Sequence, residues 1–365
     1  GPSLLPFTKY YWSLKAKLND GSWTELPEPA SFETGFMNKA SWTGHWITDT
    51  YDFNLKPAPY FRKKFSTDRK IKTARAYIAA AGLYELSING EKAGDHRLDP
   101  MYTRFDRRTL YVTYDVTRKL MQGENVIGVI LGNGWYNHQS TAVWYFDKAP
   151  WRARPKFCMD LRIIYEDGSE EVIGTGQDWK TSLSPVIFNS IYTAEHYDAR
   201  LEQPGWDTPG FDDSLWKSSL NTGAPSNNIT AQVLHPVRNV EKLPAVRMTK
   251  FSSRNYLFDF GRNISGVTEI RIKGEAGTRV RLIHAERTGS DGHADQSNID
   301  VHFRPTDDSD PFQTDIVILS GLKEDEFMPR FNYKGFQFVE VVSDKPVELG
   351  QESLTAWFMH SDVPP

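Results

Sequence analysis

The stretch Ala79-Ala-Ala-Gly-Leu-Tyr-Glu-Leu-Ser-Ile-Asn-Gly90 decides how the middle of this chain folds. Within it, Tyr84-Glu-Leu-Ser-Ile88 alternates bulky and polar side chains, which is the two-residue period of a β-strand with one buried face. Asn89-Gly90 then supplies the dipeptide most typical of a tight turn between antiparallel strands. The segment therefore predicts a strand and turn of an antiparallel sheet.

Similar short runs lie on both sides of this segment, separated by turn signals such as Gly123-Glu-Asn125 and Glu166-Asp-Gly168. Amphipathic helices do not intervene, because Val116-Thr-Arg-Lys-Leu-Met121 is long enough for one helical turn at most. Regularly spaced strands without helices are typical of an antiparallel jelly roll. The predicted strands of this unit are 60–65, 74–78, 84–88, 110–114, 126–131 and 161–165.

A further unit of strands follows the polar, proline-containing stretch Gly223-Ala-Pro-Ser-Asn-Asn228. Its strands alternate cleanly, so one face should pack and the other should meet solvent. We expect a second β-sandwich, with strands at 256–260, 268–273, 279–284, 314–319 and 336–342.

The first residues of the chain predict a hairpin rather than a domain. Tyr10-Tyr-Trp-Ser-Leu-Lys-Ala-Lys-Leu18 and Ser31-Phe-Glu-Thr-Gly35 read as strands on either side of a turn at Asn19-Asp-Gly21. An isolated hairpin is marginally stable in water, so these residues are expected to be the last strands of a sandwich whose beginning is missing. The predicted fold class is all-β, with tandem antiparallel β-sandwiches: a partial one at 1–37, a jelly roll at 38–228 and a second sandwich at 229–365.

Composition excludes several classes of function. The 365 residues include 43 Lys and Arg against 47 Asp and Glu, and no long basic run, so nucleic acid is not an expected partner. No apolar stretch approaches the roughly 20 residues that span a bilayer, and no signal peptide opens the chain. The single cysteine, Cys158, lies in an apolar alternation and is interpreted as a small buried hydrophobe rather than a reactive thiol.

A series of motifs along the chain resembles, in the same order, the β-sheet region at the front of bacterial α-L-rhamnosidases. The motifs are Ala79 to Gly90 as quoted above, Tyr111-Val-Thr-Tyr-Asp-Val116, Gly132-Asn-Gly-Trp-Tyr-Asn137, Glu195-His-Tyr-Asp-Ala-Arg-Leu-Glu-Gln-Pro-Gly-Trp206, Phe258-Asp-Phe-Gly-Arg-Asn-Ile-Ser-Gly266, His284-Ala-Glu286 and Arg330-Phe-Asn-Tyr-Lys-Gly-Phe-Gln-Phe-Val-Glu-Val341. The resemblance implies a fibronectin-III-like remnant, a galactose-binding-like jelly roll and a second β-sandwich. It also implies that the acidic catalytic residues lie on a helical barrel, which we expect to begin beyond Ser361-Asp-Val-Pro-Pro365. The resemblance therefore carries over no catalytic residue.

The acidic and metal-like motifs of the chain have structural alternatives. The densest acidic group, Glu195-His-Tyr-Asp198 with Glu202, could perform acid–base work or form a hydrogen-bonded corner, and we favour the corner. Asp259-Phe-Gly261 and His284-Ala-Glu286 are interpreted as structural, because neither has the partners that a phosphate or zinc site needs. No metal site is predicted, although oxygen ligands that could hold Ca²⁺ occur together at Asp291, Asp295, Asn298 and Asp300.

Sugar binding by the jelly roll is the main non-catalytic hypothesis. Aromatic rings stack on the apolar face of a pyranose, while amides and carboxylates bond its hydroxyls. The candidate residues, all in segments expected to form loops at one end of the sandwich, are Tyr102, Asp106, Trp135, Asn137, His138 and Trp144. The alternative is that these rings pack against the catalytic barrel. Some relatives resemble calcium-dependent rhamnose-binding modules with a polar pair before the Tyr84 strand, but this chain has Ala79-Ala-Ala81 there.

Two functions remain open. The first is the non-catalytic β-region of an exported, periplasmic or extracellular, inverting α-L-rhamnosidase, which supports the catalytic barrel and has rhamnose-containing glycans or glycosides as partners. The second is a stand-alone carbohydrate-binding or interaction module. The sequence also departs from the family at Gln337, where relatives often carry Arg in a Gly-Phe-Arg-Tyr motif.

Overall fold

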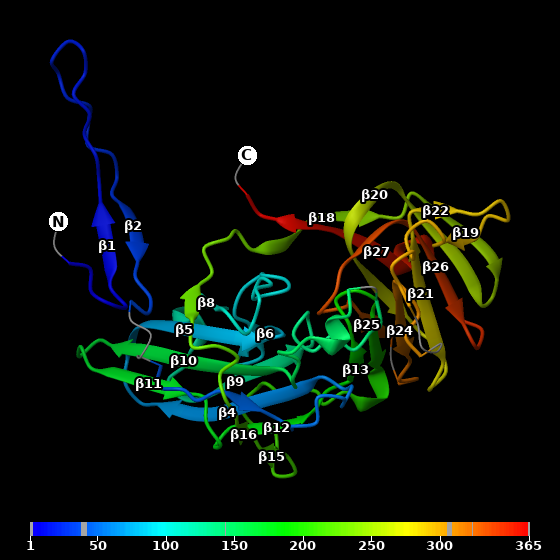
Figure 1. Cartoon of the computed structure of the whole chain (residues 1–365), viewed down its shortest axis with the longest axis horizontal. Helices are drawn as coiled ribbons and strands as arrows, with labels where there is room; N and C mark the ends of the chain where they lie inside the picture. Colours follow the sequence, from blue (N-terminus) through cyan, green and yellow to red (C-terminus); the bar gives the residue numbers. More distant parts are fainter. Residues whose placement is uncertain (1–2, 38–41, 143, 305–308, 323, 364–365) are drawn as a thin grey trace.

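The computed structural model describes residues 3–37, 42–142, 144–304, 309–322 and 324–363. Its regular elements in these ranges are strands and four short 3₁₀ helices, so the all-β prediction is confirmed. Figure 1 shows a projecting hairpin, a two-sheet sandwich and a strongly curled sheet beside it. The helical turns are η1 (Thr117–Lys119), η2 (Phe146–Lys148), η3 (Ala199–Leu201) and η4 (Gln351–Ser353).

The hairpin consists of β1 (Lys9–Trp12) and β2 (Ala30–Glu33), which pair antiparallel and are largely exposed along their length. Its base is held by aromatic rings: Phe36 lies at 5.2 Å from Tyr77 and at 5.5 Å from Tyr111 between ring centroids. Glu33 of β2 also pairs with Arg75 of the sandwich at 3.0 Å, so the described contacts lie at this end of the hairpin, and the rest projects away from it (Figure 1). The expected boundary at residue 37 adjoins 38–41, which lie outside the described residues.

Two sheets form the sandwich. The seven-stranded sheet contains, in spatial order, β16 (Leu220–Asn221), β3 (Ile47–Thr48), β10 (Lys156–Tyr165), β5 (Ile71–Ala81), β8 (Thr109–Asp115) and β17 (Ile229–Ala231), with β11 (Glu170–Gly174) paired to β10. The six-stranded sheet contains β15 (Lys217–Ser218), β12 (Lys180–Leu183), β4 (Pro59–Thr67), β9 (Gly123–Gly132), β6 (Leu83–Ile88) and β7 (Glu91–Lys92).

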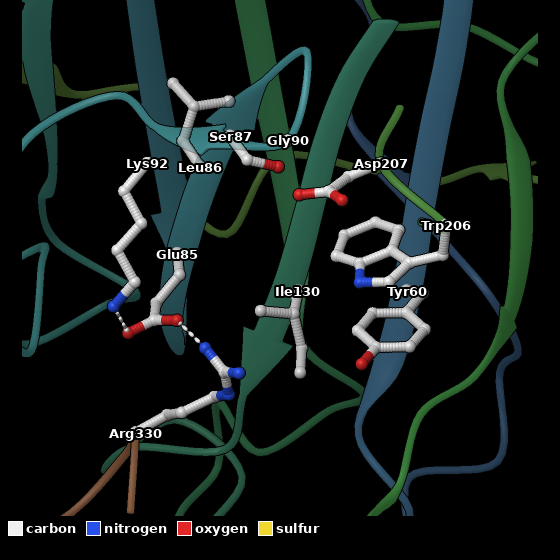
Figure 2. A pocket seen from close by; sticks show the side chains of 10 residues that line it. All are labelled: Tyr60, Glu85, Leu86, Ser87, Gly90, Lys92, Ile130, Trp206, Asp207 and Arg330. Carbon is white, nitrogen blue, oxygen red and sulfur yellow. Dashed lines mark hydrogen bonds and ion pairs between the residues drawn. The ribbon is translucent and has the colours of Figure 1, made fainter. Parts of the chain in front are cut away.

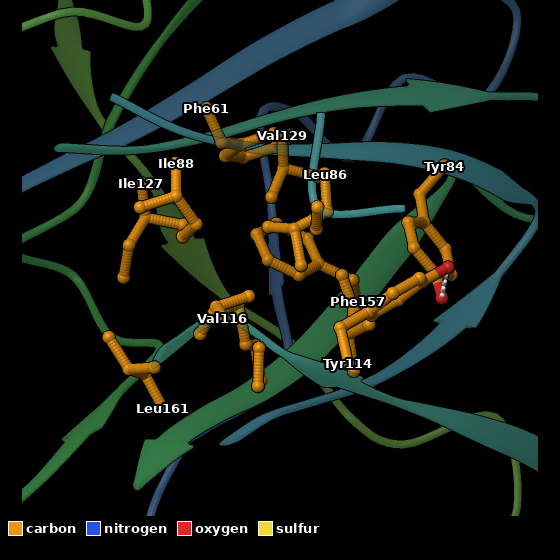
Figure 3. Close-up of a cluster of buried hydrophobic side chains, with 14 of the residues drawn as sticks. Phe61, Tyr84, Leu86, Ile88, Tyr114, Val116, Ile127, Val129, Phe157 and Leu161 are labelled. Atoms are coloured by element: carbon orange, nitrogen blue, oxygen red, sulfur yellow. Dashed lines mark hydrogen bonds between the residues drawn. The ribbon is translucent and has the colours of Figure 1, made fainter. Parts of the chain in front are cut away.

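The sandwich core lies between these sheets, as Figure 3 shows. Phe61 of β4, Leu86 of β6 and Val129 of β9 meet Phe157 of β10 there, all of them buried. Because side chains alternate across a strand, the neighbours of these core residues point to the outer face of the six-stranded sheet. That outer face carries the candidate site described below.

The third part is one ten-stranded sheet curled around its own apolar core. Its path is β13 (Val186–Asn189), β14 (Glu195–Asp198), β24 (Thr314–Ile318), β21 (Arg279–Ala285), β26 (Lys334–Ser343), β20 (Asn255–Ile272), β27 (Leu354–Ser361) and β18 (Val237–Pro244), with β19 (Arg247–Ser252) and β25 (Asp325–Phe327) on β20. A small hairpin, β22 (Arg287–Thr288) with β23 (Ala294–Asp295), lies beside it. The two strands expected at 256–260 and 268–273 are a single bulged strand, β20, because it pairs first with β26 and then with β27.

The chain crosses between the two units before the sandwich is complete. β13 and β14 extend the ten-stranded sheet, and β14 runs parallel to β24, with His196 opposite Ile316. The chain then returns to supply β15, β16 and β17 to the sandwich. The segment from Val186 to Asp198 therefore ties the units together, while the division at residue 228 stays a prediction. In the described ranges, no helix has the length and apolar character needed to cross a membrane.

Candidate functional site

A row of three side chains crosses the outer face of the six-stranded sheet. Strand register places Glu85 of β6 opposite Ile130 of β9, and Ile130 opposite Tyr60 of β4. Each is the immediate neighbour of a core residue, so strand alternation turns all three away from the core. Glu85 and Tyr60 thus stand on opposite sides of a floor formed by Ile130 (Figure 2).

The next row contains a glycine that leaves room for a covering loop. Gly128 lies between Ser87 and Arg62 across the sheet. A Cβ atom at this position would lie 2.6 Å from Cβ of Asp207 and 3.0 Å from the Trp206 ring. The absence of a side chain at Gly128 therefore allows the loop that carries Trp206 and Asp207 to approach the sheet. The Trp206 ring stacks on Tyr60 with ring centroids 3.9 Å apart.

The other wall of the site is an ion-pair triad. Lys92 Nζ lies 2.6 Å from Glu85 Oε1, and Arg330, from the loop between β25 and β26, donates to the other oxygen of Glu85. Burial alone would raise the pKa of Glu85, but the charges of Arg330, Lys92 and Arg97 lower this pKa to about 2. Glu85 is therefore ionised at neutral pH, and it bonds Arg330, which belongs to the unit of the curled sheet.

Together these walls enclose an open pocket of about 190 Å³. Figure 2 shows Glu85, Lys92 and Arg330 on one side, Tyr60 and Trp206 on the other, and Asp207 near Ser87 at one end. A pocket with aromatic, hydroxyl and charged groups has the chemistry to hold a small polar molecule.

Arg330 is held in place from behind by a buried carboxylate. Both oxygens of Glu195 accept the main-chain N–H of Arg330, at 3.1 and 3.0 Å, and Oε2 also accepts from the N–H of Phe331 at 3.1 Å. Burial raises the pKa of Glu195 to about 7, against the opposing effect of the Arg330 charge. A pKa in this range can mark a catalytic acid, but Glu195 is fully buried and does not line the pocket. Its role is to position the loop.

The remaining acidic residues of this motif also have structural partners. Asp198 pairs with Arg200 at 2.7 Å, and Tyr197 donates its hydroxyl to Glu202 at 2.5 Å. Burial lowers the pKa of His196 to about 3, so its ring is neutral. These bonds agree with the hydrogen-bonded corner expected for this motif rather than with an acid–base site.

The predicted sugar-binding residues divide into an aromatic surface, the exposed Asp106 and the buried pair Asn137 and His138. Tyr102 and Trp144 are 49% and 46% exposed, and Trp135 is half-buried, with its ring centroid 6.5 Å from that of Tyr102. Trp144 joins them through Tyr192, which contacts both tryptophans. The structure thus brings the predicted rings together.

The polar members of the predicted set bond or pack against neighbouring residues. Asn137 is buried and donates to the carbonyl of Phe53 at 3.0 Å, while Asp106 accepts from Arg104 at 2.9 Å. His138 is buried beneath Trp135, with centroids 5.3 Å apart, and burial lowers its pKa to about 4. Asn137 and His138 therefore have no surface to offer a sugar.

The structure does not assemble a calcium ligand set at the places considered from the sequence. Asp295 pairs with Arg287 at 2.7 Å, and Asn298 donates to Glu286 at 3.1 Å. Across the described ranges, no three His, Cys, Asp or Glu side chains converge on a point that could hold a metal ion. Residues 79–81 are fully buried alanines in β5, which supply no side-chain oxygen ligand, so they do not fit the polar pair expected of a calcium-dependent sugar site.

The other motifs have structural roles. Cys158 is buried, as expected, and burial raises the pKa of its thiol. Gln337 donates to Asp259 at 3.0 Å, which links β26 to β20 beside the bulge. His284 is fully buried and bonds Thr268 at 3.0 Å. The Gln337 and His284 bonds each join two strands of the ten-stranded sheet.

Sequence reasoning missed most of the pocket. Trp206 stood in a recognised motif, but its stacking on Tyr60 depends on the fold. The alternation of Glu85 and Ser87 with core residues was the available signal, because it places polar side chains on the outer face. Nothing local could reveal that Arg330, 245 positions away from Glu85, completes the wall.

A two-sheet sandwich joined to a curled sheet, with the acidic residues of β14 in structural bonds, defines this chain as an all-β region of two packed units. Residues 69–241 match the alpha-L-rhamnosidase N-terminal domain, and residues 249–360 match the bacterial alpha-L-rhamnosidase concanavalin-like domain. Taken together, these matches include most of the chain. The chain belongs to the bacterial α-L-rhamnosidase family and corresponds to its N-terminal β-region.

Individual relatives agree with this family assignment. An alpha-L-rhamnosidase of Formosa agariphila is 30% identical over 95% of this chain and 39% of its own length. An alpha-L-rhamnosidase of Streptomyces avermitilis is 35% identical over 81% of this chain and 28% of its own length. The solved α-L-rhamnosidase from Dictyoglumus thermophilum superposes with a TM-score of 0.87 at 35% identity, over 98% of this chain and 40% of that one. The chain thus spans two fifths or less of the length of these relatives.

Proposed function

We propose that this region belongs to a protein that hydrolyses terminal α-L-rhamnosides in glycans or glycosides. The observation that carries the proposal is the presence of two successive α-L-rhamnosidase domains, joined by the contacts of Arg330 and Phe331 with the sandwich. Relatives that bear the name alpha-L-rhamnosidase support it. In this proposal the β-region supports a catalytic helical barrel, and the protein acts in the periplasm or outside the cell.

The proposal is tested by comparing the chain with the complete protein that contains it. The complete protein should release nitrophenol from 4-nitrophenyl α-L-rhamnoside with inversion at the anomeric carbon, while residues 1–365 alone should release none. Absence of hydrolysis by the complete protein would overturn the proposal. Release by the chain alone, abolished by Asp198→Asn, would show instead that the acidic corner is catalytic. Fractionation of cells that express the complete protein tests the exported location.

The exposed aromatic surface favours a second, carbohydrate-binding function for the sandwich, in the sense of a jelly-roll module. Tyr102 and Trp144 present half-exposed rings around Trp135, and such rings stack on the apolar face of a sugar. One stacked ring with solvent-competed hydrogen bonds should give about 4 kcal/mol, a dissociation constant on the order of millimolar. The rings could instead cover the catalytic barrel.

Titration with L-rhamnose, followed by NMR with and without EDTA, tests this binding. Tyr102→Ala should abolish the shifts near Trp135, whereas Tyr51→Ala removes a more exposed ring elsewhere and should leave them unchanged. EDTA should have no effect, because residues 79–81 provide no side-chain ligands for calcium. Binding that is lost with chelator and insensitive to Tyr102→Ala would contradict the proposal.

A further inference from the structure

The pocket on the outer face of the six-stranded sheet is a binding site separate from the aromatic surface. We infer that it binds one neutral sugar ring, with Tyr60 and Trp206 along one side and with Glu85, Ser87, Asp207 and Arg330 as hydrogen-bonding groups. The inference does not depend on the proposed hydrolysis, nor on sugar binding at Tyr102.

The charges that line the pocket select a neutral ligand. Glu85 and Asp207 contribute two carboxylates, while Arg330 and Lys92 contribute two cations, so the formal charges cancel. An anion such as phosphate or a uronate would meet the carboxylates, and a cation would meet Arg330 and Lys92. An uncharged molecule avoids repulsion from both pairs, and its hydroxyl groups can both donate to carboxylates and accept from a guanidinium.

Unused hydrogen-bonding capacity remains in the pocket. In the described part of the chain, the Asp207 carboxylate forms no hydrogen bond or ion pair, and it faces the space near Ser87 (Figure 2). Arg330 uses Nη1 for Glu85, and a guanidinium carries five N–H donors in all. Acceptors at one end and donors at the other suit a molecule with hydroxyls on both edges.

The apolar surfaces of the pocket suit a pyranose. Ile130 forms the floor, and the stacked rings of Tyr60 and Trp206 form one wall, so the C–H groups of a sugar would contact apolar atoms while its hydroxyls meet polar ones. The volume of about 190 Å³ is smaller than the roughly 300–1,000 Å³ of pockets for drug-sized ligands. That size limits the occupant to about one ring, either a monosaccharide or one residue of a glycan.

The groups are already fixed in the positions that a ligand would need. Trp206 is stacked on Tyr60 and its main-chain N–H bonds the carbonyl of Gln203, while Glu195 holds the main chain of Arg330. Glu85 is bonded by Lys92 and Arg330 from two sides. A site formed before binding loses little conformational freedom when the ligand arrives. Because Arg330 belongs to the other unit, an occupant would also contact both units.

The test uses residues 1–365, labelled with ¹⁵N at the tryptophan indoles, and titration with L-rhamnose, D-galactose and D-glucose to tens of millimolar. At least one of these sugars should shift the Trp206 indole signal with saturation. Asp207→Ala should weaken that binding at least tenfold without unfolding the protein, because the Asp207 carboxylate forms no hydrogen bond or ion pair with another described residue. Asp68→Ala, which removes an exposed carboxylate elsewhere on the sandwich, and Tyr102→Ala should leave the titration unchanged.

Four results would overturn the inference: no shift of the Trp206 indole with any of the three sugars, equal affinity in Asp207→Ala, loss of the binding in Tyr102→Ala, or tighter binding of D-galacturonate or inorganic phosphate than of every neutral sugar. The last result would identify an anion site centred on Arg330 and Lys92. A negative titration here leaves the Tyr102 surface and the hydrolysis assay unaffected, so the failure of each proposal is seen separately.

Discussion

The carboxylate of Glu195 holds the main-chain N–H of Arg330 between its two oxygens, at 3.1 and 3.0 Å. Glu195 lies on β14, the strand that the chain contributes to the curled sheet before returning to the sandwich. The side chain of Arg330 then extends to Glu85 on the sandwich. One buried acid therefore fixes a residue that contacts both units and forms one side of the pocket.

Arg330→Met should destabilise the protein more than removal of an ordinary surface arginine. Glu85 is only 12% exposed, so the substitution leaves a nearly buried carboxylate that, among the described residues, keeps its ion pair with Lys92 alone. Loss of a hydrogen bond to a charged group costs roughly 1.5–3 kcal/mol. Because the Arg330 side chain is 38% exposed, we expect a decrease of about 1–2 kcal/mol in the free energy of unfolding measured in urea.

Arg271→Met is the matched control, since Arg271 is 56% exposed and pairs with Glu269 on the surface of the curled sheet. Its effect should stay within about 0.5 kcal/mol. Equal losses in the two variants would show that the Arg330 bond contributes no more than a surface ion pair.

Glu195 should make the protein less stable as pH rises toward neutrality. Its pKa is raised to about 7 in the folded state from an ordinary value of 4.5, so the folded protein holds this proton more tightly than the unfolded chain. The resulting stabilisation is fully present below pH 4.5, declines between pH 4.5 and 7, and is absent above that range. Glu195→Gln resembles the protonated side chain and should remove this dependence.

The measurement is the difference in unfolding free energy between Glu195→Gln and the unaltered protein, at pH 4 and at pH 8. The variant should gain relative stability at pH 8. Glu166→Gln, at an exposed turn, serves as the control and should show no such change. A difference for Glu195→Gln that is the same at both pH values would contradict the assignment.

Local patterns predicted the strands well because alternation is a property of neighbouring residues. The stretch 84–88 lies within β6, and 126–131 lies within β9. Pairing is not local, and the predictions depart from the structure where pairing decides the outcome. β20 continues through the glycines at 261 and 266 because two different partners bond its two halves. The parallel contact of β14 with β24 joins segments more than a hundred residues apart, and no turn signal marks it.

Like the strands, the candidate sites could be predicted from the sequence only where local patterns decide them. The aromatic residues Tyr102, Trp135 and Trp144 do gather on one surface, where the Tyr102 ring lies 6.5 Å from that of Trp135 and Tyr192 contacts both tryptophans. The burial of Asn137 and His138 could not be predicted, since it depends on how the surrounding loops pack over the strand end. The pocket needs Arg330 from the other unit, so its complete wall exists only in the folded chain.

Gly132→Ala should weaken the packing between the sandwich and the curled sheet. Phe331, next to Arg330, is buried against Leu83 and Ile130, and a Cβ atom at Gly132 would overlap its ring. Overpacking of this kind costs roughly 1–3 kcal/mol. Gly223→Ala is the control, because a Cβ there would meet no neighbouring atom. Thermal unfolding should show a lower midpoint for the first variant only.

A double-mutant cycle identifies the cause of that loss. Phe331→Ala alone should cost roughly 3–5 kcal/mol through the cavity it leaves. In the double variant, the added methyl group of Gly132→Ala enters this cavity, so the combined loss should be smaller than the sum of the single losses. Strict additivity would show that the effect of Gly132→Ala arises elsewhere, for example in the backbone of β9.

The projecting hairpin should exchange its amide hydrogens faster than any strand of the two units. β1 and β2 bury few side chains, and strands with few buried contacts open locally at low free-energy cost. Protection should begin at the base, where Thr34 bonds the carbonyl of Thr8 and Phe36 donates its N–H to the Tyr111 hydroxyl. Hydrogen exchange read by mass spectrometry should therefore divide at about residue 34. Protection of residues 10–33 equal to that of β5 would contradict this prediction and would mean that the hairpin docks on the sandwich in solution. In that case the protection would not depend on the base, and Phe36→Ala would leave it unchanged.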